Sequence, residues 1–471
     1  MIKVSQPTQL PSAVNPTAKN AVPKLTFWPL VVATFFMVSG GTYGTEEIVH
    51  GAGYGRAILI LLFTPLLWSL PTALIIGELS SALPSEGGYY AWVRRGLGNF
   101  WGFQEAWLSL AASVFDMAIY PTLFVGYLTQ IAPWFRESHR GVMVGLFVVI
   151  ACTVLNLAGI RAVSLTSLWL FFLLSSPFAL IVLLSPFRAG ALTEAHLSPS
   201  TSTVGLLGGI LIAMWNYMGW DNASTIAQEV EQPQRTYPRA MIGAVILVSL
   251  SYILPFSAVY LTGLPASAFA GDGTWVQVAG LIAGTWRGAN WLGFLLVLGG
   301  MMSAFGMFNA LVLSYSRVPF ALARDGMLPK ALAKIHPKTQ VPWVAIVLCA
   351  AGWALCLGLG FERLVTLDIM LYGISLMLEF VTLVALRLRE PQLEREFRVP
   401  GGLPGAILAG VFPLLLLVLA LINGQHETVL GMNGLTFGAL IILAGFAVYL
   451  ATAKLRRETL PQAVVESAET S

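Results

Sequence analysis

Long apolar runs separated by short polar loops make up most of this sequence. A run of about 20 apolar residues is long enough to cross the hydrocarbon core of a bilayer as a helix. The pattern predicts twelve such spans, at approximately residues 26–52, 57–79, 99–129, 142–159, 164–185, 203–228, 238–262, 291–318, 341–360, 364–387, 403–423 and 432–453. The chain is therefore predicted to be an all-α integral membrane protein.

Two of the predicted spans, the first and the sixth, are interrupted by weak helix formers. The first contains SGGTYG, residues 39–44, followed by the adjacent carboxylates Glu46 and Glu47. The sixth contains WNYMGWDN, residues 215–222. Pairing spans one to five with spans six to ten puts the two breaks in register, and because five is odd the two halves have opposite topology. Matching broken helices in an inverted repeat indicate a transport site near the bilayer midplane.

This repeat defines the predicted domain organisation. One transporter domain covers residues 26–453, with repeats at about 26–185 and 203–387 and two further helices within about 403–453. The remaining residues, 1–25 and 454–471, are predicted to be tails.

The distribution of basic residues predicts the orientation of the spans. Short basic loops stay on the cytoplasmic side of a membrane. With a cytoplasmic N-terminus, six of the 26 Lys and Arg residues lie outside: Arg56, Arg136, Arg140, Arg188, Arg287 and Arg363. We therefore expect both termini on the cytoplasmic side of the plasma (inner) membrane.

Composition excludes several classes of function. Charged residues make up 10% of the chain, against about 25% in ordinary soluble domains. The three cysteines and five histidines lack the spacing of a metal site or a disulfide framework. The net charge of +3 is too small to indicate nucleic-acid binding. With no catalytic dyad in the sequence, we expect no enzyme activity, no cofactor, no metal and no obligate protein partner.

Three stretches resemble the amino acid–polyamine–organocation superfamily of secondary transporters. They are the glycine break at residues 39–44, LPSEGGYYAWVRRGLGNFWGFQEAW at residues 83–107, and SRVPFALARDGMLP at residues 316–329. Within the superfamily, the strongest resemblance is to plant-type polyamine uptake transporters, which are related to the L-type amino acid transporters. It rests on VSGG followed by an acid, on FDMAIYP at residues 115–121, and on WDNASTIAQEVEQP at residues 220–233.

The resemblance implies a LeuT-like fold with a five-plus-five inverted repeat and broken helices 1 and 6. It also implies a substrate held between spans one, three, six, eight and ten. In amino acid members of the superfamily, the glycines of span one free backbone amides that bind the substrate carboxylate. Carbonyl groups around the break in span six bind its amine.

Carboxylates inside the spans favour a cationic substrate instead. Glu46 lies in the first turn of the resumed helix, Asp116 lies well inside span three, and Asp221 follows the second break. Each buried carboxylate costs about 2.5–3.5 kcal/mol on insertion scales, so an intramembrane acid is a functional hypothesis by default. No intramembrane lysine or arginine is available to pair with these acids, because the few arginines within the predicted ranges, Arg239, Arg317 and Arg387, lie at the ends of their spans. The missing partner is a cationic substrate or a proton.

A polyamine needs separated carboxylates with aromatic walls between them, because its ammonium groups are joined by an apolar stem. Ring faces attract ammonium groups, and the candidate walls are Tyr43, Trp107, Tyr120, Trp215, Tyr217 and Trp220. The predicted substrate-binding residues are Ser39, Gly40, Gly41, Tyr43, Gly44, Glu46, Asp116, Tyr120, Trp215, Asn216, Tyr217, Trp220 and Asp221.

Several assignments stay open at this level. Burial near other acids favours the protonated form of a carboxyl group, so Glu46, Asp116 and Asp221 are candidates for a coupling proton. Glu105 is a candidate for the inner pathway, while Asp368 and Glu379 fit either the pathway or a structural pairing. The leading hypothesis is uptake of polyamines or other organic cations, coupled to protons, while proton symport, sodium symport and exchange all stay open. The alternatives are an amino acid permease or exchanger and, from another class, a channel or membrane-embedded enzyme.

Overall fold

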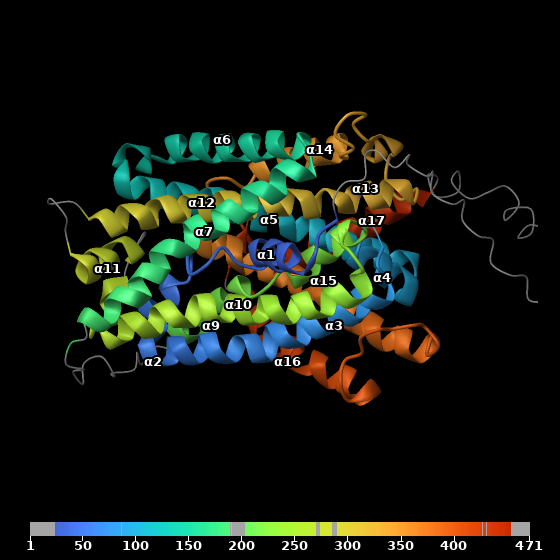
Figure 1. Ribbon diagram of the computed structural model, residues 1–471. Helices are drawn as coiled ribbons and strands as arrows, with labels where there is room; N and C mark the ends of the chain where they lie inside the picture. Colours follow the sequence, from blue (N-terminus) through green and yellow to red (C-terminus); the bar gives the residue numbers. More distant parts are fainter. Residues whose placement is uncertain are drawn as a thin grey trace, which may run out of the picture.

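The computed structural model is a bundle of helices that run side by side along one long axis (Figure 1). It describes residues 24–85, 87–188, 190, 203–269, 274–284, 290–425, 427–429 and 431–453. The predicted tails, apart from residues 24 and 25, lie outside these ranges.

The first half of the chain contains two short helices, a long kinked segment and three further long helices. Its elements are α1 Phe27–Val38, α2 Glu46–Thr64, the π-helical turn η1 Pro65–Ser69, α3 Leu70–Ala82, α4 Tyr89–Leu97, α5 Asn99–Ile131, η2 Pro133–Arg136, α6 Ser138–Leu157, α7 Ile160–Leu184 and η3 Ser185–Arg188.

The second half adds further helices and one small β-hairpin. Its elements are α9 Thr203–Asn216, η4 Trp220–Glu229, α10 Pro233–Leu261, η5 Ala266–Phe269, α11 Thr274–Ala283, α12 Trp291–Tyr315, α13 Arg317–Arg324, η6 Lys330–Ala333, α14 Trp343–Ala354, α15 Phe361–Arg389, α16 Gly402–Gly424, β1 Thr428–Val429, β2 Met432–Asn433 and α17 Gly434–Ala451.

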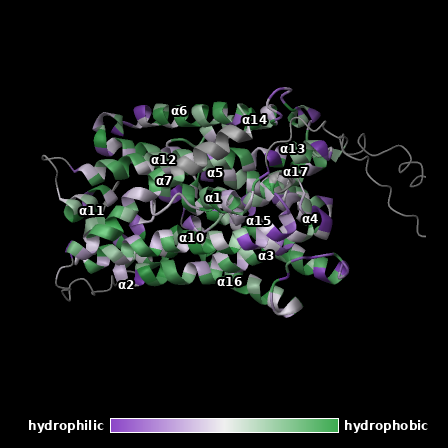
Figure 2. Cartoon of the chain, viewed as in Figure 1, coloured by the Kyte–Doolittle hydropathy of each residue, from purple (hydrophilic) through white to green (hydrophobic). Residues whose placement is uncertain are grey.

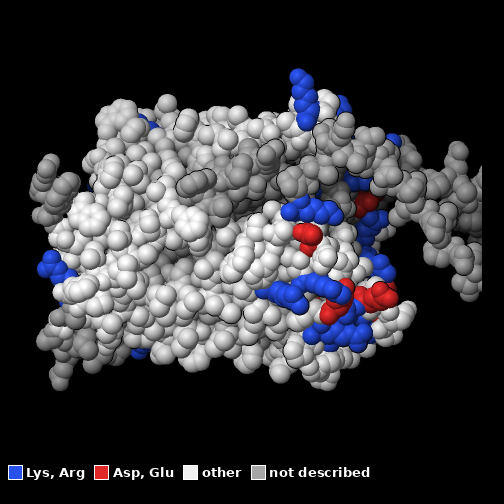
Figure 3. All heavy atoms as spheres, viewed as in Figure 1, with Lys and Arg blue, Asp and Glu red and all other residues white. Residues whose placement is uncertain are grey.

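The described residues include nine helical segments that are long and apolar enough to cross a membrane, and two shorter apolar helices, α1 and α14. Apolar residues dominate the sides of the bundle in Figure 2. Charged side chains gather near one end of the face seen in Figure 3, around α4 and α13, and are fewer at the other end. This distribution is the one expected for a bundle surrounded by lipid tails and flanked by water.

Each predicted span falls within helical segments, but the end of the first span and the whole of the second belong to one continuous segment, Glu46–Ala82. Spans one and two meet at Gly53, whose φ of +74° kinks the helical segment that continues to α3. The hydropathy pattern did not predict α4, α11, α13 or the hairpin. The helices α4 and α13 are short and contain arginines, so they produce no apolar run of membrane length.

The first break separates α1 from α2 and is stabilised by hydrogen bonds from neighbouring side chains. Gly41 and Gly44 both have φ of +84°, a conformation that residues with a side chain rarely adopt. The Gly41 amide donates to Ser39 Oγ at 3.1 Å, and Ser303 Oγ donates to the Gly40 carbonyl at 2.5 Å. A Cβ atom on Gly40 would lie 2.0 Å from Ser303 Oγ, so glycine at this position allows α12 to approach the break.

The second break separates α9 from η4 and is stabilised in the same way. Gly219 has φ of +89°, and its amide donates to the Tyr372 hydroxyl at 3.1 Å. Trp220 Nε1 donates to the Tyr217 carbonyl at 2.7 Å. Backbone groups that leave the helix pattern are therefore bonded inside the protein, as an apolar environment requires.

One side chain on α10, Tyr252, joins the two breaks. Its hydroxyl lies 2.6 Å from Ser39 Oγ and 2.8 Å from the Asn216 carbonyl. Because a phenol has a single O–H donor, the Tyr252 hydroxyl donates to the Asn216 carbonyl and accepts a hydrogen bond from the Ser39 hydroxyl. The relative positions of α1 and α9 are thus linked through one buried hydroxyl group.

A buried ionic network joins helices at the charged end of the bundle. Glu78 on α3 is fully buried and binds Arg387 on α15 through two contacts, Nε–Oε1 at 2.9 Å and Nη2–Oε2 at 2.5 Å. Arg395 Nε lies 3.3 Å from Glu78 Oε1, and the Val399 amide donates to Oε2 at 2.6 Å. The network holds α3, the end of α15 and the following loop together.

Replacement of Gly219 by alanine tests the geometry of the second break. A Cβ atom there would lie 2.7 Å from the Met37 carbonyl of the first break, at a positive φ. We expect Gly219→Ala to lower the free energy of unfolding by about 2 kcal/mol or more, seen as a lower thermal midpoint of the purified protein.

The matched control is Gly208→Ala on α9, where an added Cβ meets nothing within 4 Å. Alanine is the better helix former, so this variant should be as stable as the parent or slightly more stable. Equal midpoints for the two variants would contradict the close approach of the breaks.

Candidate functional site

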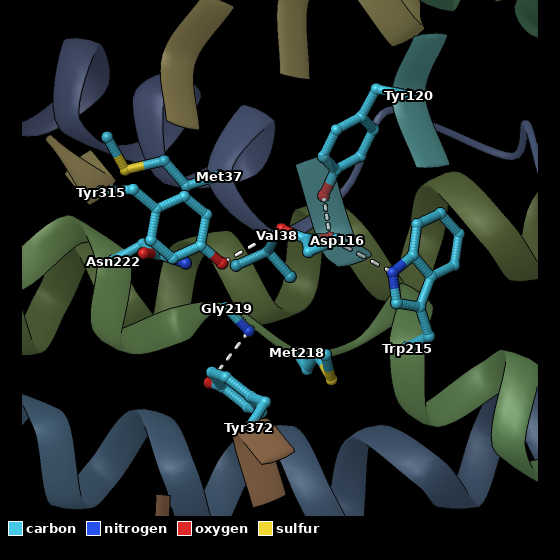
Figure 4. A pocket seen from close by; sticks show the side chains of 10 residues that line it. All are labelled: Met37, Val38, Asp116, Tyr120, Trp215, Met218, Gly219, Asn222, Tyr315 and Tyr372. Carbon is cyan, nitrogen blue, oxygen red and sulfur yellow. Dashed lines mark hydrogen bonds between the residues drawn. The ribbon is translucent and has the colours of Figure 1, made fainter. Parts of the chain in front are cut away.

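A small cavity lies where the two breaks meet α5, α12 and α15. It is lined by Met37, Val38, Asp116, Tyr120, Trp215, Met218, Gly219, Asn222, Tyr315 and Tyr372 (Figure 4). Its volume of about 10 Å³ leaves room for about one water molecule. The site is therefore closed in this conformation, and a larger ligand requires its walls to move.

Among the described residues, Asp116 is the one acidic residue that lines the cavity directly. Its Oδ1 accepts hydrogen bonds from the Tyr120 hydroxyl at 2.7 Å and from Trp215 Nε1 at 3.4 Å. Its Oδ2 accepts from the Tyr315 hydroxyl at 3.0 Å. Figure 4 shows these three aromatic side chains converging on the carboxylate from different helices. The donors orient a buried negative group without neutralising it.

Asp221 lies directly behind the cavity wall. Its Oδ1 accepts a 2.5 Å hydrogen bond from the Tyr372 hydroxyl, and Tyr372 in turn lines the cavity. Asp221 is 2% exposed. A rotation of the Tyr372 side chain would therefore bring a second carboxylate into contact with a ligand held at Asp116.

A third carboxylate, Asp368 on α15, lies close to both of these acids. It is 1% exposed, and both its carboxylate oxygens lack a hydrogen-bond partner among the described residues. Asp116 and Asp221 are the charged groups that act on it electrostatically. Asp368 lies four residues before Tyr372, on the same helix face, and this spacing was a signal that could have assigned it to the site.

No described Lys, Arg or His forms an ion pair with any of these three aspartates. An apolar, low-dielectric surrounding makes an uncompensated charge costly. The arrangement can therefore bind a cationic ligand or protons.

Glu46 lies apart from this cavity. It is buried, whereas Glu47 is half-buried, which identifies Glu46 as the inward-facing acid. Its Oε1 accepts a 2.5 Å hydrogen bond from the Tyr127 hydroxyl. Tyr127 lies eleven residues beyond Asp116 on α5, a rise of about 16 Å along the helix. The structure thus places Glu46 beside Tyr43 and Tyr127 rather than in the cavity lining.

Three of the thirteen predicted substrate-binding residues line the cavity, namely Asp116, Tyr120 and Trp215. Tyr217 and Trp220 are fully buried and bond to backbone carbonyls, Tyr217 to Leu61 at 3.0 Å and Trp220 to Tyr217. Asn216 Nδ2 donates to the Ile212 carbonyl at 2.8 Å. The other predicted residues outside the lining are Ser39, Gly40, Gly41, Tyr43, Gly44, Glu46 and Asp221.

Trp215 forms the aromatic cover of the cavity. Its ring lies 6.2 Å from the ring of Tyr120 and 5.5 Å from that of Phe361, measured between centroids. Tyr315 and Tyr372 complete the aromatic wall. These two tyrosines could not be predicted from the sequence, because a phenol within an apolar helix gives the same pattern whether it packs against other helices or binds a ligand.

Comparison with known proteins identifies relatives along nearly the whole chain. Residues 31–447 match the amino acid permease family. A polyamine transporter of Arabidopsis thaliana is 33% identical over 420 residues, which are 88% of this chain and 84% of that protein. A polyamine transporter of Oryza sativa subsp. japonica is 33% identical over 402 residues, 83% of this chain and 72% of that protein.

An amino acid exchanger is also similar. A serine/threonine exchanger of Bacillus subtilis is 26% identical over 357 residues, which are 73% of this chain and 78% of that protein. The family match and the coverage of these relatives agree with a bundle of apolar helices broken at two facing points. The chain therefore belongs to the amino acid permease family and is an integral membrane transporter, not an enzyme.

Proposed function

We propose that this protein takes up polyamines or similar organic cations across the plasma membrane by alternating access. The observation that carries the proposal is the group Asp116, Asp221 and Asp368, three buried carboxylates beside an aromatic cavity, with which no basic side chain of the described residues is paired. Two relatives at 33% identity are named polyamine transporters, which supports the same substrate class.

The transport cycle uses the two breaks as the moving walls of the site. We propose twelve spans with a five-plus-five inverted repeat in a LeuT-like arrangement and both termini in the cytoplasm. One ammonium group of the substrate binds Asp116, and the rings of Trp215, Tyr120 and Tyr315 enclose it. Cation–π contacts with such rings contribute about 0.5–2 kcal/mol each when desolvated. Because the cavity is closed in this structure, substrate enters and leaves through conformations in which one side opens.

The second candidate function is transport of neutral or cationic amino acids. It is favoured by the similarity to a serine/threonine exchanger. An amino acid needs a partner for its carboxylate, and the lining of the cavity supplies the Gly219 amide, which is bonded to Tyr372 here. The three acidic groups near the cavity oppose a substrate carboxylate, so the polyamine is the better fit.

A ligand screen on the purified protein separates the two functions. We expect putrescine and spermidine to raise the thermal midpoint, whereas leucine does not. A ligand at 100 times its Kd stabilises the native state by about 2.7 kcal/mol. Arginine is the matched probe, since it carries a cationic side chain on an amino acid. Stabilisation by leucine or serine without an effect of putrescine would replace the polyamine by an amino acid and leave the transporter unchanged.

Asparagine substitutions test the role of the two hydrogen-bonded aspartates. Asp116→Asn and Asp221→Asn retain the side-chain shape and remove the charge, and the loss of a charged contact costs about 1.5–3 kcal/mol. We expect the Kd for spermidine to rise about tenfold to a hundredfold, measured by calorimetric titration.

The control for these variants is Glu394→Gln, which removes an acid from an exposed loop beyond α15. It should leave the Kd unchanged. If Asp221→Asn binds spermidine as the parent does, Asp221 does not bind the cation, and an amino acid substrate becomes the favoured function.

We further propose that Glu46 carries the coupling proton. Its hydrogen bond to Tyr127 holds it outside the cavity lining, so that a proton there does not displace the substrate from Asp116.

In proteoliposomes, a pH gradient with the acidic side outside should accelerate the uptake of spermidine by the parent protein. Glu46→Gln should abolish this acceleration and preserve spermidine binding in detergent. Glu47→Gln, at the half-buried neighbour, is the matched control; equal gradient dependence in the Glu46 variant would contradict the assignment.

A further inference from the structure

Two more buried acids lie away from the cavity, Glu105 on α5 and Glu379 on α15. Both are fully buried. Glu105 Oε1 accepts a 3.0 Å hydrogen bond from Ser375 Oγ, and its Oε2 has no partner among the described residues. Both oxygens of Glu379 likewise lack a partner within the described part of the chain. The helix packing alone does not explain why two such costly groups are present.

Glu105 and Glu379 form a second pair of acids, arranged like the central pair Asp116 and Asp368. Glu105 precedes Asp116 by eleven residues on α5, and Glu379 follows Asp368 by eleven residues on α15. In each helix this spacing is three turns, so the acids share a face and are about 16 Å apart along the axis. The two helices pack together in opposite directions, as the contact between Ser375 and Glu105 and the proximity of Asp368 to Asp116 require. Two pairs of acids therefore lie one above the other.

Asp221 bonds to α15 at a level between Asp368 and Glu379, because its partner Tyr372 follows Asp368 by four residues and precedes Glu379 by seven. Its charge acts on Asp368 in the central pair and on Glu105 and Glu379 in the other pair. The same three acids, Asp221, Glu105 and Glu379, act on the buried Tyr89, whose hydroxyl lies 3.0 Å from Ser109 Oγ. Tyr372, which bonds to Asp221, and Tyr89 are thus the aromatic residues associated with these acids.

The basic side chains of the described residues do not compensate the charge of Glu105 and Glu379. The nearest arginine along α15 is Arg387, two turns beyond Glu379. Its guanidinium group binds Glu78 and the carbonyls of Val399 and Gly402 instead. No described Lys, Arg or His forms an ion pair with Glu105 or Glu379. The pair is therefore suited to bind a cationic group of the substrate.

We propose that Glu105 and Glu379 form a second ammonium-binding subsite, so that a linear polyamine with three or four amines is held at both levels of acids. This inference rests on the proposed function. A diamine such as putrescine has two ammonium groups a short distance apart and uses the acids around Asp116 and Asp221. Spermidine and spermine are longer, and their additional ammonium group reaches past Asp221 towards the second pair. The subsite thus selects among polyamines by length and number of charges.

Glutamine at position 379 is the sharpest test. Glu379→Gln preserves the shape of the side chain and removes a buried, unpartnered charge, so the variant is expected to fold. Calorimetric titration of the full-length protein with putrescine, spermidine and spermine measures the Kd for each. We expect the Kd for spermidine and spermine to rise about tenfold to a hundredfold, while the Kd for putrescine stays that of the parent.

Two further variants complete the experiment. Glu105→Gln should reproduce the selective loss, and unchanged putrescine binding shows that each variant is correctly folded. The matched control is Glu362→Gln at the exposed start of α15, which should leave all three Kd values unchanged.

The possible results separate this inference from the proposed function. An equal loss for all three amines, or no loss for any, overturns the second subsite while polyamine transport stands. A change only in the pH dependence of uptake, with unchanged Kd values, also overturns it and identifies the pair as a proton site. If the parent protein binds none of the three amines, the proposed function fails, and the subsite fails with it.

Discussion

The requirement that every backbone polar group find a partner in an apolar surrounding governs this structure. A helix satisfies the requirement by itself, and a broken helix does not. The chain breaks two helices and then supplies hydroxyl, indole and phenol groups from α10, α12, α15 and η4 to satisfy the freed groups. The site can exist only where these supporting helices meet, which explains why the cavity lies at the centre of the bundle.

Much of the helical framework could be predicted from the sequence, because the hydrophobic pattern of a membrane helix is long and almost unambiguous. The two breaks could also be predicted from the sequence, since glycines beside polar residues interrupt otherwise apolar runs. The short helices α4 and α13 were not, because nine and eight residues leave no signal of membrane length.

The side chains of the site were harder to predict for a geometric reason. Asp116 and Tyr120 share one unbroken helix, so their spacing fixed their common face, and both line the cavity. Trp215 and Trp220 lie on opposite sides of a break, where the regular rotation of a helix is lost, and only Trp215 reaches the cavity. Glu46 follows the other break and is the first residue of α2, so its position depends on the path of the non-helical residues between α1 and α2. Sequence spacing contains no information on that path.

The closed cavity has a consequence for the energetics of binding. A site that holds about one water molecule cannot accept a larger ligand in this conformation, so a ligand binds only those conformers in which the site is open. The measured dissociation constant then equals the intrinsic constant divided by the fraction of open molecules. Substitutions that merely loosen the contact between Trp215 and Phe361 would tighten apparent binding without adding a single new contact to the substrate. The apparent affinity therefore depends partly on contacts that keep the site closed, in addition to contacts with the ligand.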